Sequence, residues 1–242
     1  MNPLATLARR HVADEQMDAA DLSPAAYDAV LRDLARVNAV TLAGRATDRF
    51  LAAVHARHAS ERPWRILDVG FGHGDMLRRI ARWSARRGQR VELTGIDLNP
   101  KSEASARAAT PPGMAIAWRT GDYRDLAGGD WDIVVSSLVA HHMDDAERRA
   151  FVRFMERETR LGWLVNDLHR HRLAFVGYPW LARAMRVDPI VRADGQLSIA
   201  RSFRRGEWQA MLAEAGLAEA GLAKRARIVR RFPFRLCVER IR

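Results

Sequence analysis

A glycine-rich segment carries the strongest chemical signal in the sequence. Residues 66–74 read ILDVGFGHG, so glycine recurs at every second position after a short apolar run. Glycines at a strand end let the backbone approach a ligand where a Cβ atom would clash. The G-x-G-x-G spacing differs from the G-x-G-x-x-G of dinucleotide sites. Asp68 lies two residues before the first glycine. Its negative charge would oppose binding of a pyrophosphate, but it is compatible with a ligand that carries a positive charge.

Three later segments place polar groups after apolar runs. Asp97 ends one run and can accept hydrogen bonds from both hydroxyls of a ribose. Asp122 lies in a Gly-Asp-Tyr run, where its carboxylate can accept an exocyclic amine of adenine and the Tyr123 ring can pack on the base. The run at 132–143 ends in Ala-His-His-Met. Each acid could instead cap a helix or close a turn, but four such segments in order indicate one ligand site.

Three histidines are candidates for proton transfer. His141 and His142 follow the fourth expected strand, and His169 follows the fifth. A base near neutrality can deprotonate a phenol, whose own pKa is about 10, and we favour His142 for this role. The alternative is that these side chains only shape their loops, or that one caps the helix expected after Asp144. No third ligand accompanies either neighbouring pair of histidines, so we predict no metal site.

Regular alternation of strands and helices is expected from residue 64 onward. We expect strands at 65–69, 91–96, 114–120, 131–136 and 161–166, and helices at 76–86, 102–109 and 144–159. Apolar strands in this alternation indicate a parallel sheet covered on both faces. Stretches 225–232 and 234–240 alternate charged and apolar residues, which predicts two strands at an exposed sheet edge.

Two regions lie outside this alternation. Residues 1–62 are expected to be helical, with Ser23 and Pro24 starting one helix and a second helix at about 47–58. Within residues 168–203 the sequence predicts a helix at 173–186, followed by a loop that contains Asp188-Pro189 and Asp194-Gly195. A helix at 206–215 follows, closed by a glycine at 216. Segments after strand carboxyl ends cover ligand crevices. Apolar residues of the insertion that could line a pocket are Leu173, Phe175, Tyr178, Trp180 and Met185.

Composition excludes several classes of protein. Of 242 residues, 48% are hydrophobic and 29% charged, which indicates a globular chain rather than a disordered one. No run approaches the roughly 18 apolar residues of a membrane helix. Cys237 is the single cysteine, so no internal disulfide forms and a cytoplasmic location is expected. The net charge of +11 comes almost entirely from scattered arginines. We interpret them as a general bias in amino-acid composition and not as a surface that binds nucleic acid.

The order of these segments resembles that of the class I S-adenosylmethionine-dependent methyltransferases over about residues 64–166. The resemblance implies S-adenosylmethionine as the cofactor and an α/β fold: a Rossmann-like seven-stranded mostly parallel sheet with helices on both faces, plus N-terminal helices and a helical lid insertion. Residues 1–62 would be an N-terminal helical cap and 63–242 the cofactor-binding methyltransferase domain, with the lid at about 168–203. The residues implied to bind the cofactor are Asp68, Gly70, Gly72, Asp97, Leu98, Gly121, Asp122, Tyr123, Ser137 and Leu138.

A narrower resemblance rests on four runs: Glu15-x-Met17-Asp18, Leu-Ala-Arg-Val-Asn at 34–38, His-His-Met at 141–143 and Asn-Asp-Leu-His-Arg at 166–170. These look like bacterial small-molecule methyltransferases associated with polyketide and quinone-type natural products. The substrates of such enzymes are diverse, and the resemblance does not fix the acceptor atom. Our leading hypothesis is methyl transfer to a hydroxyl of an aromatic or polyketide-like small molecule, with a histidine base. Alternatives are a carbon or nitrogen acceptor, RNA methylation, or a binding module without activity. We expect an aromatic or hydrophobic acceptor, no nucleic acid and no stable membrane insertion, and leave a homodimer open.

Overall fold

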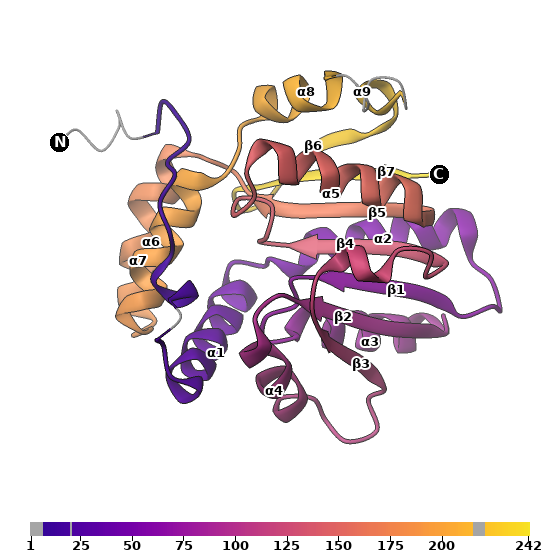
Figure 1. Ribbon diagram of the computed structural model, residues 1–242, viewed down its shortest axis with the longest axis horizontal. Helices are drawn as coiled ribbons and strands as arrows, with labels where there is room; N and C mark the ends of the chain where they lie inside the picture. Colours follow the sequence, from indigo (N-terminus) through magenta and orange to yellow (C-terminus); the bar gives the residue numbers. More distant parts are fainter. Residues whose placement is uncertain (1–6, 20, 215–220) are drawn as a thin grey trace.

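A seven-stranded sheet forms the centre of the computed structural model, which describes residues 7–19, 21–214 and 221–242 (Figure 1). The strand order is β3-β2-β1-β4-β5-β7-β6. Strands β1 to β5 run parallel, and β7 is antiparallel to both β5 and β6. The strands are β1 (Trp64–Val69), β2 (Val91–Asp97), β3 (Ile116–Thr120), β4 (Trp131–Ser137), β5 (Thr159–Leu168), β6 (Arg227–Arg231) and β7 (Arg235–Ile241). The predicted mostly parallel seven-stranded sheet is confirmed.

Helices cover both faces of this sheet. The helices are α1 (Pro24–Val40), α2 (Gly44–His58), α3 (Asp75–Arg87), α4 (Pro100–Ala108), α5 (Asp145–Glu158), α6 (Arg172–Ala184), α7 (Pro189–Arg201), α8 (Arg205–Ala213) and α9 (Leu222–Arg225). Successive residues of β1 point to opposite faces. Ile66 packs with α2 and α3 on one face, and Leu67 packs with α5 and α8 on the other. No helix in these ranges is long and apolar enough to span a bilayer.

Local capping signals set the starts of several helices. The Ser23 hydroxyl accepts a hydrogen bond from the Ala26 N–H at the start of α1, as predicted. Asp144 and Glu147 form a reciprocal capping box at the start of α5. That helix is therefore capped by its own acid, and neither neighbouring histidine is needed as a cap.

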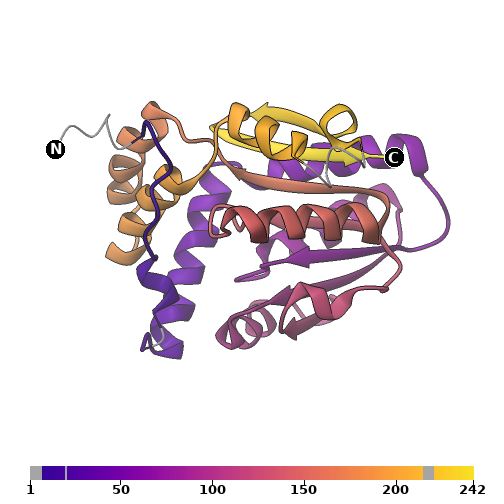
Figure 2. The ribbon, with the colours of Figure 1, turned by 45° about the horizontal axis from the view of Figure 1, so that its top comes forward.

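The N-terminal segment and the lid form a separate layer over the carboxyl ends of the parallel strands. Helices α6 and α7 pack against α1 through an apolar cluster that includes Val30, Val37 and Val191. Residues before α1 run along α7 in both ribbon views (Figures 1 and 2), and the His11 N–H donates to the Ala200 carbonyl. This layer closes the sheet end where ligands bind in open α/β folds.

Three expectations about these outer regions are wrong. Residues 7–15 are not helical; they run alongside α7 and lead into a short 3-10 turn, η1 (Gln16–Asp18). Asp194 and Gly195 lie inside α7 and not in a loop. The Asp194 carboxylate accepts the Gln16 and Met17 N–H groups, so the acid caps η1 from within a helix. Strand β7 is buried rather than exposed, because β5 and β6 flank it; of these two C-terminal strands, β6 is the edge strand.

Two further expectations about the fold stay untested. The helix-closing glycine expected at 216 lies outside the described residues. The division into residues 1–62 and 63–242 stays a prediction. Helix α2 nevertheless belongs physically with the sheet, because Phe50, Leu51 and Val54 pack into the same core as β1.

Gly195 provides a test of the lid packing. A Cβ atom there would lie 2.2 Å from the Tyr178 hydroxyl, which is held by a 2.7 Å hydrogen bond to the Val191 carbonyl. We expect Gly195→Ala to lower the free energy of unfolding by about 1–3 kcal/mol through overpacking. Gly177→Ala is the matched control, since its Cβ meets nothing within 4 Å; it should stabilise by about 0.5–1 kcal/mol. Urea unfolding measures both, and equal effects would contradict the packing shown.

Candidate active site

A cavity of about 790 Å³ opens at the carboxyl ends of the parallel strands. Its walls come from the glycine turn after β1, helix α1, the loop after β4, helices α6 and α7, and the start of β7. All ten residues that the sequence assigned to cofactor binding line this cavity, and so do His141 and His142. His169 does not line it. The topology therefore brings separate sequence segments to one site.

The glycine turn is shaped by close approach to neighbouring side chains. Gly70 and Gly74 have φ values of 76° and 74°, in the left-handed region that favours glycine. A Cβ on Gly70 would lie 2.3 Å from the Val139 side chain, and one on Gly74 would lie 2.4 Å from Trp118. The turn thus needs glycine for both conformation and space.

Asp97 ties the ends of three strands together. Its carboxylate accepts the Gly72 N–H at 2.8 Å and the Asn99 N–H at 2.9 Å, and its carbonyl accepts the Gly121 N–H at 2.9 Å. Burial raises the pKa of Asp97, while the two N–H groups on the carboxylate oppose that rise. The carboxylate is fixed at the cavity wall with acceptor capacity left for hydroxyl donors.

Asp68 is the one acid of β1 and lines the cavity without a partner. Its side chain is 1% exposed, and neither oxygen has a hydrogen-bond partner among the described residues. Burial raises the pKa of Asp68 well above its usual range, and the nearby charges of Asp75 and Asp97 add to the effect. A buried carboxylate without donors is costly, so this position fits a ligand that carries a positive charge or N–H donors.

The far end of the cavity carries the residues expected near adenine. Leu98 is 74% exposed, so an apolar face is open there. Asp122 is paired with Arg124, which lowers the pKa of Asp122. The Tyr123 ring lies edge-on to Phe151 and Phe154, with centroids 4.9 and 4.8 Å away. Helix α5 therefore sets the orientation of Tyr123.

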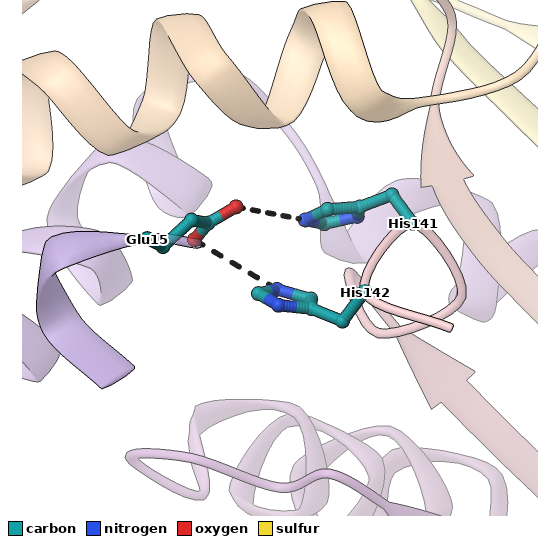
Figure 3. Close-up of side chains that lie close together, drawn as sticks. All are labelled: Glu15, His141 and His142. Atoms are coloured by element: carbon teal, nitrogen blue, oxygen red, sulfur yellow. Dashed lines mark ion pairs between the residues drawn. The ribbon is translucent and has the colours of Figure 1, made fainter. Parts of the chain in front are cut away.

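His141 lies between two buried carboxylates, those of Asp167 and Glu15. Figure 3 shows its contact with Glu15. Its Nδ1 is 2.8 Å from an Asp167 oxygen, and its backbone N–H donates to the other Asp167 oxygen. Its Nε2 is 3.6 Å from Glu15. Burial alone would lower the pKa of His141, but the charges and hydrogen bonds of Asp167 and Glu15 outweigh it and raise this pKa to about 9. At neutral pH the ring is an imidazolium with no lone pair to accept a proton.

His142 is the histidine that faces the cavity with partial exposure, 31% of its side chain. Its ring centroid is 4.3 Å from that of His141. Nε2 is 3.8 Å from Glu15 and Nδ1 is 3.5 Å from Asp18, so carboxylates flank the ring on both sides. The ring can therefore contact a molecule in the cavity.

His169 lies in a different environment from the other two. It pairs by an isolated bridge with Phe203, and its ring is near His171. Burial, followed by the charges of Arg230 and other basic neighbours, lowers the pKa of His169 to about 4. It is neutral at pH 7 and lies away from the cavity lining. Its proposed catalytic role therefore has no geometric support.

Sequence reasoning missed Glu15 as a site residue. Its carboxylate is buried, accepts the Ser198 hydroxyl at 2.7 Å, and lies 3.8 Å from Arg201. Burial opposes ionisation of Glu15, but His141 outweighs it and lowers the pKa of Glu15. No local pattern identifies such a residue, because its partners come from the loop after β4 and from α7.

The Glu15 cluster also has ligand atoms that a metal ion could use. Glu15, His141 and His142 each offer one atom, all within 4.8 Å of one another. Protonation of His141 and the nearby guanidinium of Arg201 disfavour a cation at this point. The absence of a metal stays a prediction.

Of the five lid residues expected to line a pocket, Leu173 and Tyr178 do so. The other three are absent from the lining, and Trp180 is 72% exposed on the outer surface. The expectation is therefore half right: the amphipathic helix places one face on the cavity and the other in solvent.

The opposite environments of His141 and His169 are directly testable. We expect an NMR titration of the imidazole carbons to give a midpoint near pH 9 for His141 and near pH 4 for His169. Asp167→Asn should move the His141 midpoint down, because it removes the charge and keeps the shape. His141 holds its proton more tightly in the folded state. Its contribution to stability is therefore full below about pH 6.5 and is lost as pH rises through about 9. A His141 midpoint at or below 6.5 would contradict the buried ion pairs.

Comparison with known proteins agrees with this architecture. Residues 66–162 match the family model described as a methyltransferase domain. No curated protein matches the sequence. One similar solved structure is a plantazolicin methyltransferase in complex with a monoazolic desmethyl analogue and S-adenosylhomocysteine. It is 12% identical, with a TM-score of 0.62, and the match covers 87% of this chain and 89% of that one.

A second similar structure is the magnesium protoporphyrin IX methyltransferase from Synechocystis PCC 6803 with bound S-adenosylmethionine. It is 16% identical, with a TM-score of 0.53, and the match covers 88% of this chain and 83% of that one. At these identities the likeness shows the fold alone. Residues 66–162 carry a methyltransferase domain, and the chain has the fold seen in these S-adenosylmethionine-dependent methyltransferases.

Proposed function

We propose that the protein transfers a methyl group from S-adenosylmethionine to a hydroxyl of an aromatic or polyketide-like small molecule. The observation that carries this proposal is one cavity that holds an unpartnered buried acid, Asp68, and a partly exposed histidine, His142. When bound, the cofactor supplies an electrophilic methyl group on a sulfonium. The tasks left to this chain are to orient the two molecules, to exclude water and to take up the acceptor's proton.

The cavity wall fits the parts of the cofactor in the order of the strands. Asp68 would receive the amino group of the methionine part beside Gly70 and Gly72, since its oxygens lack donors. Asp97 would accept the ribose hydroxyls with its remaining lone pairs. Leu98 and Asp122, with Gly121 and Tyr123, would contact the adenine.

Ser137 and Leu138, at the end of β4, would lie near the sulfonium. Leu138 has a φ of 64°, unusual for a side chain of its type. Its N–H donates to the Asn166 carbonyl at 3.0 Å, and the Asn166 amide donates to the Ser137 hydroxyl at 3.2 Å. The end of β5 therefore holds this turn in place against the cavity.

His142 is the residue that we assign as the general base. His141 is already protonated at neutral pH, and His169 lies outside the cavity lining. His142 would accept the hydroxyl proton, and the carboxylates of Glu15 and Asp18 would stabilise the imidazolium that forms. His141 acts as a positioning residue that fixes Glu15 and the loop carrying His142.

Apolar side chains form the remaining wall where an acceptor would lie. They come from α1, from α6 and from the turn before β7, and they include Leu34, Leu173, Leu181 and Phe234. An apolar wall of this kind suits an aromatic or hydrophobic acceptor.

The role of Asp68 is tested by cofactor affinity. We expect Asp68→Asn to weaken S-adenosylmethionine binding by about 10- to 100-fold, because it removes a charge-assisted contact worth about 1.5–3 kcal/mol. Asp48→Asn, which alters an acid outside the cavity, is the control. Isothermal titration calorimetry measures this affinity and also the number of protons released or taken up on binding. With the raised pKa of Asp68, cofactor binding should release protons and tighten as pH rises. Unchanged affinity in Asp68→Asn would remove this residue from the site.

The role of His142 is tested by turnover on a phenolic acceptor. We expect His142→Ala to lower kcat by about 100-fold or more while S-adenosylhomocysteine binds as before. The residual rate should rise with pH toward the phenol's own pKa of about 10, where no base is needed. His169→Ala is the matched control and should retain turnover. Normal kcat in His142→Ala would show that another group takes the proton.

A further inference from the structure

Arg235, the first residue of β7, lies in the cavity wall with an incomplete set of partners. Its side chain is 3% exposed. Nη2 donates to the Thr41 hydroxyl at 3.3 Å, and Nη1 has no hydrogen-bond partner among the described residues. Asp167 and Asp75 are the acids that act on it most strongly, yet neither forms an ion pair with it. The guanidinium thus lacks a direct counter-charge within residues 7–19, 21–214 and 221–242.

Two other strongly buried arginines are each paired with an acid. Arg170 binds the Glu207 carboxylate at 2.6 Å and two backbone carbonyls. Arg148 binds the Asp145 carboxylate at 2.9 Å. An arginine keeps its charge in proteins, and a buried charge without a partner is expensive. Arg235 lines the cavity and has no acid paired with it among the described residues, so its position fits a counter-charge that arrives with a ligand.

The sheet order separates Arg235 from the residues assigned to the cofactor. Asp68 lies on β1 and Arg235 on β7, with β4 and β5 between them. Three inter-strand spacings correspond to roughly 14 Å. The cofactor's carboxylate shares a carbon with the amino group that Asp68 would hold, which places it toward β1. Leu168, which pairs with Arg235 across the sheet, and Phe234, which precedes it in the sequence, also line the cavity, and both are apolar.

We propose that Arg235 binds the carboxylate of the acceptor, so that the protein methylates a hydroxy-substituted aromatic acid in preference to a neutral phenol. The planar guanidinium can hold a carboxylate through two parallel hydrogen bonds, which fixes both position and rotation of the ring. The apolar chamber then accepts the ring and its substituents. This inference rests on the proposed function, and it specifies in addition that the acceptor carries a negatively charged carboxylate.

A matched pair of probes tests the proposal on the unaltered protein loaded with S-adenosylhomocysteine. The acid is 2-hydroxy-6-pentylbenzoate, and its neutral counterpart is 3-pentylphenol, which lacks only the carboxylate. We expect calorimetry to show at least about tenfold tighter binding of the acid. Equal affinities, or tighter binding of the phenol, would overturn the proposal without requiring any variant.

Variants then locate the preference. Arg235→Met should abolish the preference for the acid and leave 3-pentylphenol affinity unchanged, whereas Arg235→Lys should retain part of it. Arg230→Met removes a positive charge from the adjacent strand outside the cavity lining, and it should bind both probes as the unaltered protein does. A preference that survives in Arg235→Met would overturn the assignment.

The same experiments separate this inference from the function on which it rests. If the unaltered protein takes up no S-adenosylhomocysteine, the proposed function fails. If it binds that compound and methylates a phenol but shows no preference for the acid, the Arg235 proposal alone fails. A loss of S-adenosylhomocysteine affinity in folded Arg235→Met would show that the arginine serves the cofactor's carboxylate, and it would also overturn the proposal.

Discussion

The buried chain of charges from Asp167 through His141 to Glu15 is the constraint on which the rest of the site depends. It joins the end of β5, the loop after β4 and the segment before η1, which are far apart in the sequence. Removing one member would leave a buried charge unpaired, at a cost of about 3–5 kcal/mol. These ion pairs therefore hold the N-terminal segment over the cavity and fix the loop that carries His142. Closure of the site and placement of the proposed base have the same physical cause.

The cavity also carries opposite charges that the protein itself does not neutralise. Among the described residues, no donor contacts the Asp68 carboxylate and no acid forms an ion pair with the Arg235 guanidinium. Both are buried, so each lowers stability until a complementary group arrives. In the proposed function a cationic cofactor satisfies the first and an anionic acceptor the second. Two ligands of opposite charge would then approach each other between them, in a chamber that excludes water and strengthens their attraction.

Local pattern was sufficient to predict the sheet, the glycine turn and Asp97, because strand periodicity and turn chemistry lie within a few residues of each other. It was insufficient wherever a distant partner decides the outcome. Asp194-Gly195 looks like a turn, yet it continues a helix because η1 uses the acid and Tyr178 fills the space beside the glycine. The charged alternation around Arg235 predicts an exposed strand, but β6 and the cavity wall bury it. The Glu15 contact with His141 has no local signature at all.

A crystal structure with S-adenosylhomocysteine tests the central claim most directly. The account predicts that the amino group lies within hydrogen-bond distance of Asp68 and that the ribose hydroxyls contact Asp97. It also predicts that the sulfur faces a chamber bordered by His142. A structure with the nucleoside bound away from Asp68 and Asp97, or with His142 turned away from the space in front of the sulfur, would contradict it.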